Sequence, residues 1–155
     1  MRIIRSLDEL RNLVGKELGV SDWLEITQDR LNCFAKATGD DNWIHTDSSR
    51  ATNESPFGNT IAHGYLSLSL ITFLAKSIYR VDGLGLAINY GVDRVRFPCP
   101  VKVGSEVRAR QKVVSADSKG SGRVKLINEV LIEIKGEVKP ACVARTLTIF
   151  LSSLS

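Results

Sequence analysis

A nearly uncharged segment of 19 residues, Ile61 to Tyr79, limits what this chain can fold into. Its only full charge is Lys76, it contains no proline, and its large apolar side chains surround the axis of an α-helix instead of forming one stripe. A helix that is apolar on all sides lies inside a protein or inside a membrane. Six polar side chains are too many for a lone membrane span, namely His63, Ser67, Ser69, Thr72, Lys76 and Ser77. The segment therefore predicts a core helix enclosed by a sheet.

Four stretches after this helix alternate between apolar and polar residues, as half-buried strands do. They cover residues 86–97, 107–114, 124–134 and 141–151. In the first stretch the apolar positions change parity after Gly91, which predicts a β-bulge there. Turn-forming residues at 117–122 and 136–140 predict hairpins, so we expect an antiparallel sheet.

The first sixty residues predict short helices. Ser6 and Glu9 form a capping box for a helix that ends near Val14, and residues 16–26 are expected to be extended. A second helix starts at residue 27 or 28 and ends at Gly39, since glycine is typical of helix C-caps.

Residues 40–46 are expected to form a loop, and Asp47 is expected to cap a short helix over residues 50–53.

Helices that are segregated from an antiparallel sheet predict an α+β fold. A long helix in the concave face of a curled antiparallel sheet is the hot-dog fold. The length of 155 residues suits one domain, residues 1–155. Such a sheet leaves an edge strand and an incomplete cover for the helix, so we expect a homodimer that forms by edge pairing.

Composition excludes several classes of function. The net charge of +4 carries no Lys/Arg block and no basic residues interleaved with aromatics, so no nucleic-acid partner is expected. The three cysteines, Cys33, Cys99 and Cys142, lack the spacing of a zinc site or a disulfide framework. Cys33 and Cys142 fall in apolar runs and are expected to be buried. No signal-peptide pattern opens the chain, so a cytoplasmic location without a membrane anchor is expected.

Asp40 and His45 are the first candidates for catalysis. Two residues five apart on a helix point about 140° away from each other, so both can meet one substrate atom only if the segment is not helical. Turn formers surround Asp40, and we expect a bend that brings its carboxylate to the imidazole. His45 can exchange protons near neutral pH, because an unperturbed histidine has a pKa of about 6.5.

Gly64 stands at the predicted start of the core helix. Without a side chain it would let a carbonyl oxygen approach the backbone N–H, where the helix dipole favours negative charge. An acid, a base and an oxyanion site are what the hydration of an α,β-unsaturated thioester requires. Water attacks C3, negative charge gathers on the carbonyl oxygen at Gly64, and a proton reaches C2.

Each residue also has a simpler interpretation. Asp40 could be a turn residue after a helix cap, His45 a buried hydrogen-bonded histidine, and His63 a support for loop packing. Thr72 lies two turns beyond Gly64 and could reach the site or fill the core. Asp40, His45 and His63, with Asp41, could bind a metal, but no H-x-x-x-H or H-E-x-x-H spacing supports this, so no metal is expected.

These segments resemble the MaoC-like dehydratase family, the (R)-specific enoyl-CoA hydratases. That family carries the pattern G-D-x-N-P-x-H, an acidic residue two positions on, and I-x-H-G-M/Y-L downstream. This chain has G-D-D-N-W-I-H at residues 39–45, Asp47 at the acidic position, and I-A-H-G-Y-L at residues 61–66. The match extends through residues 55–58, 89–91, 96–98, 100–101 and 103–104, and it looks closest to the single-domain branch that includes nodulation protein N-like sequences.

The resemblance implies a hot-dog homodimer with an acyl-CoA tunnel and no metal or redox cofactor. It implies Asp40 and His45 as the catalytic pair and Gly64 as the oxyanion donor, with Asn42, His63 and Thr72 near the substrate. Trp43 replaces the usual proline, so a bulky ring enters the region.

The expected reaction is reversible hydration of trans-2-enoyl-CoA to (R)-3-hydroxyacyl-CoA. The alternatives are a hot-dog acyl-CoA thioesterase and a non-catalytic acyl-CoA-binding module.

Overall fold

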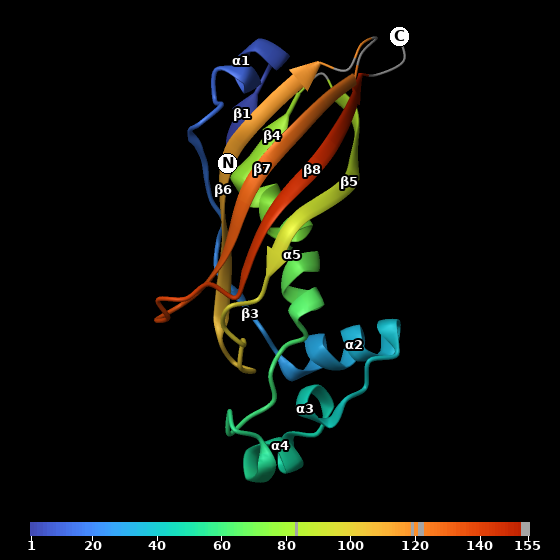
Figure 1. Ribbon diagram of the computed structural model, residues 1–155, viewed down its shortest axis with the longest axis vertical. Helices are drawn as coiled ribbons and strands as arrows, with labels where there is room; N and C mark the ends of the chain where they lie inside the picture. The colour runs from blue at the N-terminus through green and yellow to red at the C-terminus, as the bar shows by residue number, and fades with distance from the viewer. Residues whose placement is uncertain (83, 119, 121–122, 153–155) are drawn as a thin grey trace.

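The computed structural model describes residues 1–82, 84–118, 120 and 123–152. A curled antiparallel sheet lies along helix α5 (Gly64–Ile78), as Figure 1 shows. The strands follow the order β2-β6-β7-β8-β5, and β3 pairs with β6 beside β2. Their bounds are β2 (Glu17–Val20), β3 (Leu24–Glu25), β5 (Leu84–Arg96), β6 (Glu106–Ser118), β7 (Arg123–Ile134) and β8 (Cys142–Ser152). The predicted α+β hot-dog fold is confirmed.

Helix α5 packs one side against the concave face of this sheet. The apolar residues that face the sheet are buried, namely Leu66, Leu70, Ile71, Leu74 and Ile78. On the other side the Tyr65 side chain is 69% exposed and the Phe73 side chain is 53% exposed. The sheet therefore covers the helix incompletely, as predicted, because a curled sheet covers one side of a helix only.

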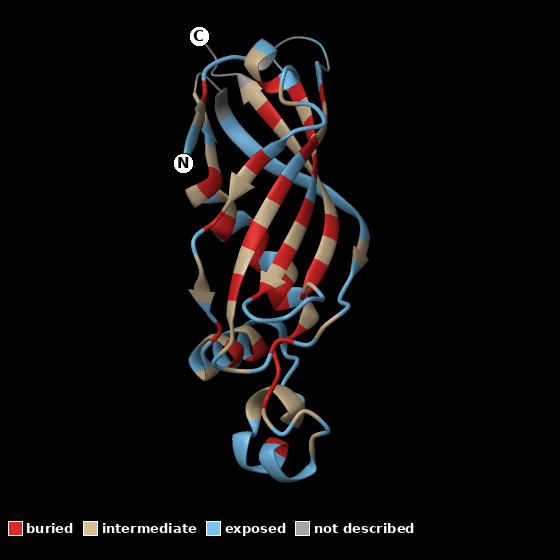
Figure 2. Ribbon diagram, turned by 90° about the vertical axis from the view of Figure 1, so that its left-hand side faces the viewer, coloured by how far each residue is buried: buried red, intermediate tan, exposed pale blue. Residues whose placement is uncertain are grey.

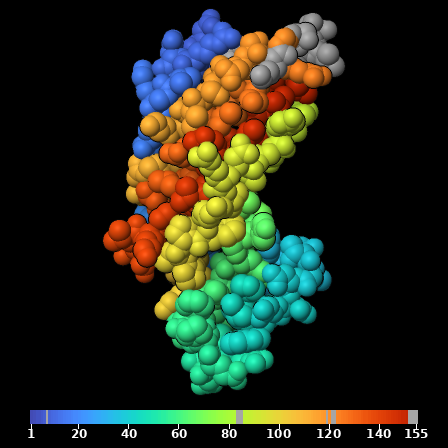
Figure 3. All heavy atoms as spheres, in the orientation of Figure 1, coloured from blue at the N-terminus to red at the C-terminus, as the bar shows by residue number. Residues whose placement is uncertain are grey.

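Helix α2 (Gln28–Thr38), α3 (Trp43–Thr46) and α4 (Ser48–Glu54) form a lobe beyond the lower end of the sheet in Figures 1 and 3. The predicted start of α2 and its predicted cap at Gly39 are confirmed. The Thr27 side chain accepts a hydrogen bond from the Arg30 N–H, and Gly39 adopts the left-handed conformation at φ 77°. Asp47 caps α4 as expected, although α4 begins at Ser48.

The loop predicted over residues 40–46 is wrong at its end, because Trp43–Thr46 form one helical turn. The side-chain oxygen of Asn42 accepts a hydrogen bond from the Ile44 N–H and so caps this turn. Asp40 lies before the turn, in the bend between α2 and α3. Asp40 and His45 therefore do not share one helix, and the bend that their meeting requires is present.

A parallel pair of three-residue strands, β1 (Arg2–Ile4) and β4 (Tyr79–Val81), was not predicted. Helix α1 (Leu7–Arg11) follows β1 and ends earlier than expected, with turns up to Gly15. Strands of three residues are too short to show a periodic pattern.

The long strands confirm the sequence pattern in detail. The pairing of β5 with β8 shifts register between Asn89 and Gly91, where the bulge was predicted. The turn at residues 136–140 joins the antiparallel strands β7 and β8. The turn predicted at residues 117–122 lies partly outside the described residues.

The inward-facing rows of the sheet form the core with α5. Alternate residues of β6 and β7 are buried, which Figure 2 shows as bands of buried and partly exposed positions. Among the described residues, no helix is long and apolar enough to cross a membrane.

Cysteine burial was predicted correctly in one case only. Cys142 is buried in β8 as predicted, but Cys33 is exposed. Helix α2 buries Leu31 and Ala35, and Cys33 lies two residues from each, on another side of the helix.

We expect Leu74→Ala to lower the free energy of unfolding by about 2–5 kcal/mol, because it opens a cavity between α5 and the sheet. Denaturant unfolding of both proteins measures this effect. Val138 is fully exposed, so Val138→Ala should change the value by no more than about 0.5 kcal/mol. Equal effects of the two changes would contradict the packing described for α5.

Candidate active site

His45 lies in the single turn of α3, and a backbone carbonyl fixes its ring. Its Nδ1 lies 2.6 Å from the carbonyl oxygen of Ile61. A carbonyl oxygen only accepts, so Nδ1 carries the hydrogen and donates it. In the neutral ring Nε2 then keeps its lone pair and can accept a proton or a hydrogen bond. The fold thus selects the tautomer in which His45 can act as a base.

His63 lies against His45 at the start of α5. The two rings stack, with centroids 3.7 Å apart and planes 28° apart. The His63 side chain is 2% exposed, and Phe34 of α2 packs against it at 5.0 Å between centroids. Its Nε2 donates to the backbone carbonyl of Asp40 at 2.9 Å. His63 therefore supports both the His45 ring and the bend that carries Asp40.

Asp40 projects its carboxylate toward the same point. Its Oδ2 lies 4.0 Å from the His63 Nε2, and its side chain is 56% exposed. Asp40, His45 and His63 each contribute one carboxylate oxygen or ring nitrogen to a cluster, and these three atoms lie within 4.8 Å of one another. The two residues that sequence reasoning paired, Asp40 and His45, thus share one site whose carboxylate is open to solvent.

Electrostatics at this site favour a neutral His45. Partial burial lowers the pKa of His45, and the neighbouring His63 lowers it further. The hydrogen bond to Ile61 and the charge of Asp40 oppose this effect without reversing it. At neutral pH the ring therefore holds a free lone pair at Nε2, in the same site as the Asp40 side chain.

Gly64 begins α5, directly after His63. Among the described residues, none accepts a hydrogen bond from its N–H, as expected for the first turn of a helix. A Cβ at Gly64 would lie 2.8 Å from the Phe97 ring, which is closer than real Cβ contacts. The close approach that requires glycine here is therefore made by Phe97, while the amide remains available as a donor.

Asn42 and Thr72 lie outside the cluster formed by Asp40, His45 and His63. The Asn42 side chain caps α3, and the backbone carbonyl of Asn42 accepts a hydrogen bond from Thr46 Oγ1. Thr72 lies two turns along α5 and accepts a hydrogen bond from Asn89 Nδ2 at 3.3 Å. Trp43 packs beneath Arg50, whose guanidinium carbon lies 4.3 Å from the ring centroid. The structure brings together Asp40, His45 and His63, with Gly64 next to His63 in the chain, and it places Thr72 in the lining of the cavity beside α5.

Gln28 of α2 is a supporting residue that sequence reasoning missed. Its Nε2 donates to the backbone carbonyl of His45 at 2.7 Å, and its Oε1 accepts from the buried hydroxyl of Thr60 at 2.6 Å. Gln28 thereby joins α2 to α3 and to the segment before α5. No local pattern marks it, because its partners are 17 and 32 residues away.

The same three side chains could be considered as metal ligands. Imidazole lone pairs lie in the plane of the ring, so two stacked rings 28° apart do not direct them at one ion. Nε2 of His63 is also engaged with the carbonyl of Asp40. The stack suits proton transfer by His45 better than joint coordination, and the absence of a metal stays a prediction.

Residues 9–133 match the family described as MaoC like domain. The chain belongs to the MaoC-like dehydratase family. Its fold and the order of its site segments agree with this assignment, and family membership makes it an enzyme of the hydratase/dehydratase type.

Two relatives and one solved structure show how similar this chain is to other proteins in sequence and in fold. The chain is 47% identical to 3-hydroxyacyl-thioester dehydratase Z of Mycobacterium tuberculosis H37Rv, over 95% of this chain and 97% of the relative. It is 41% identical to Nodulation protein N of Rhizobium leguminosarum bv. viciae, over 93% and 90% of the two chains. Unliganded R-hydratase PhaJ1 from Pseudomonas aeruginosa superposes with a TM-score of 0.68 at 25% identity, covering 90% of this chain and 83% of that one.

The lowered pKa of His45 makes a prediction for stability. Because the folded state binds a proton at His45 less readily than the unfolded state, the free energy of unfolding should fall as pH drops below about 6.5. His45→Asn removes this titration, so its free energy of unfolding should vary less between about pH 5 and 7. Denaturant unfolding across this range measures both proteins. Identical pH profiles would show that burial does not perturb His45.

Proposed function

We propose that this protein is an (R)-specific enoyl-CoA hydratase, which reversibly hydrates trans-2-enoyl-CoA to (R)-3-hydroxyacyl-CoA. The observation that carries the proposal is the pairing of a carboxylate, Asp40, with a neutral histidine, His45, at the amino end of the helix that begins at Gly64. The names of the relatives, a 3-hydroxyacyl-thioester dehydratase and an R-hydratase, support the same reaction.

In this mechanism a single water lies between Asp40 and the free Nε2 of His45. Its oxygen forms the new bond to C3 of the enoyl thioester, and the thioester carbonyl oxygen takes up the negative charge. The Gly64 N–H and the positive end of the α5 dipole stabilise that charge. One proton of the water passes through the pair to C2, so the water is added completely and the pair returns to its starting state.

The proposal includes no metal and no redox cofactor, because adding water requires only proton transfer and charge stabilisation. It also includes one functional domain over residues 1–155 and a cytoplasmic location, to which the three free cysteines are suited. Coenzyme A is the expected carrier of the acyl chain.

A second copy of this chain is the proposed partner. Strand β5 lies at one edge of the sheet. Its apolar residues Leu86, Ile88 and Val92 are 43–56% exposed. The exposed rings of Tyr65 and Phe73 extend this apolar surface onto α5. An unpaired edge with apolar neighbours fits pairing with an identical edge in a two-fold dimer.

Asp40→Asn and His45→Gln should each lower the turnover of crotonyl-CoA by about 10²–10⁴, because each removes a group that handles protons. Loss of the enoyl absorbance measures the reaction. Asp41→Asn is the matched control, since Asp41 is an exposed neighbouring acid outside the group formed by Asp40, His45 and His63.

Two results would contradict hydration. Release of free CoA thiol from saturated acyl-CoA, without enoyl hydration, would identify a thioesterase. Tight binding of enoyl-CoA that is recovered unchanged, at every chain length, would identify a binding module.

Ile88→Lys should convert the dimer to a monomer, because a charge on an edge strand opposes pairing. Light scattering after size exclusion measures the mass of both proteins. Val138→Lys places the same charge at a fully exposed position between β7 and β8 and should leave the dimer intact. A monomeric wild-type protein would refute the dimer.

A further inference from the structure

A belt of polar side chains crosses the apolar interior of the sheet. On β7 the inward row reads Val124, Leu126, Asn128, Val130, Ile132 and Ile134. Asn128 is its only polar member, and it is 2% exposed. On β6 the inward row likewise contains Gln111, also 2% exposed, between Ala109 and Val113. A core that served only stability would continue the apolar rows.

The belt continues in register onto the next two strands. Asn128 stands opposite Thr146 of β8, and Thr148 stands opposite Asn89 of β5. Thr146 and Thr148 occupy the same alternating row as the buried residues Cys142, Ala144 and Phe150. Four adjacent strands therefore present polar groups inward at neighbouring positions.

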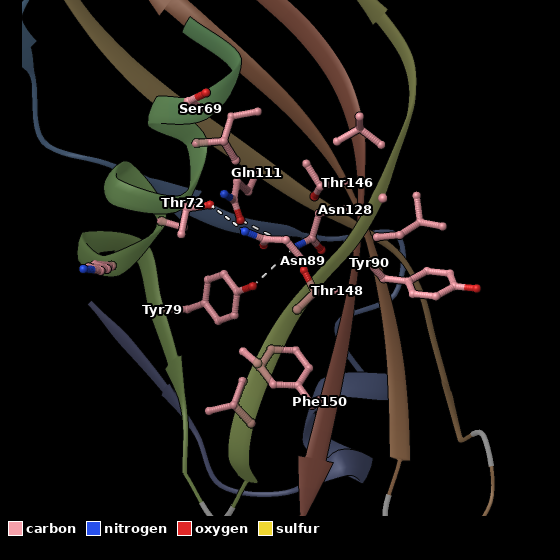
Figure 4. A pocket seen from close by; sticks show the side chains of 18 of the residues that line it. Ser69, Thr72, Tyr79, Asn89, Tyr90, Gln111, Asn128, Thr146, Thr148 and Phe150 are labelled. Atoms are coloured by element: carbon pink, nitrogen blue, oxygen red, sulfur yellow. Dashed lines mark hydrogen bonds between the residues drawn. The ribbon is translucent and has the colours of Figure 1, made fainter. Parts of the chain in front are cut away.

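These groups line a cavity of about 840 Å³ between the sheet and α5. Figure 4 shows Gln111, Asn128, Thr146 and Asn89 together on its wall, with the Tyr79 hydroxyl directed toward them. Burial raises the pKa of Tyr79, so its phenol stays protonated. The volume falls within the range of small-molecule sites, which is about 300–1,000 Å³.

One acceptor in this belt has no partner among the described residues. Asn128 Nδ2 donates to Tyr79 Oη at 3.4 Å and to Gln111 Oε1 at 3.5 Å. Its Oδ1 is buried, and no described residue donates a hydrogen bond to it. A buried carbonyl oxygen without a donor is costly, so such a group fits a site that is completed by a ligand.

Helix α5 connects this cavity with the candidate active site. Leu68 and Ser69 line the cavity, and Leu68 lies four residues after Gly64, a rise of about 6 Å along the helix. A thioester whose carbonyl binds at Gly64 can therefore extend its acyl chain along α5 toward Asn128.

We propose that the acyl chain of the preferred substrate carries a hydroxyl group far from the thioester, which donates a hydrogen bond to Asn128 Oδ1. The inference rests on the proposed function, since it names the substrate class of the same enzyme. A plain alkyl chain would leave the Asn128 oxygen unpaired and would desolvate the other polar groups of the belt. A hydroxyl can donate to Asn128 and accept from a neighbouring hydroxyl.

The test compares binding of saturated acyl-CoA pairs, which cannot be hydrated. Octanoyl-, decanoyl- and dodecanoyl-CoA are each compared with their ω-hydroxy derivative by titration calorimetry with the wild-type protein. At the best-fitting length, the hydroxylated compound should bind about tenfold more tightly. In Asn128→Leu, which replaces the amide by an apolar side chain of similar size, the preference should disappear or reverse.

Two controls separate ligand recognition from packing. Asn128→Leu removes an unpaired buried oxygen but also takes a donor from Gln111 Oε1, so the two effects oppose each other and its unfolding temperature should stay close to that of the wild type. Ile132→Val alters the same inward row outside the cavity lining and should keep the preference for the hydroxylated chain.

Equal or weaker binding of every hydroxylated compound by the wild type would overturn the inference and would indicate that Asn128 binds an ordered water only. Hydration of crotonyl-CoA is measured separately. A lack of hydration would refute the proposed function. The binding comparison would still show whether the cavity recognises a hydroxyl group.

Discussion

The segment between the helical lobe and α5 holds the rest of the molecule in place. The Ile61 carbonyl accepts from the His45 ring, and the following amide, that of Ala62, donates to the Val101 carbonyl at 2.7 Å. His63 then donates to the carbonyl of Asp40 before the helix starts. Three consecutive residues thus tie the lobe, the connection between β5 and β6, and the start of the central helix to one another. The first of these bonds also fixes the His45 tautomer, so a contact that holds the lobe in place also prepares the site.

Sequence periodicity predicted the parts of the fold that repeat a pattern over many residues. The strands alternate over eleven to thirteen residues, and the parity change at Gly91 marks a real register shift. The one-turn helix at residues 43–46 and the three-residue strands β1 and β4 were missed. In elements so short, one cap or one partner strand determines the conformation, and such partners are set by tertiary contacts.

Sequence motifs predicted the composition of the site but not the division of roles within it. The spacing of Asp40 and His45 required a bend, and the bend is present. The stack of His63 on His45, the support from Gln28 and the cover of Gly64 by Phe97 join residues 17 to 33 positions apart. No local sequence pattern contains such contacts, because they depend on how the lobe packs against the start of α5 in the folded chain.

Two of the register shifts in the sheet lie beside the polar belt. One register shift separates Asn89 from Gly91 on β5, and another separates Val113 from Ser115 on β6, close to Gln111. A bulge bends its strand and re-aims the side chains next to it. In a sheet that served packing alone, such shifts would only disrupt the hydrogen bonds between the strands. Here they border the residues that face the cavity, so the curl that closes the sheet around α5 also turns the amide groups toward the space left between them.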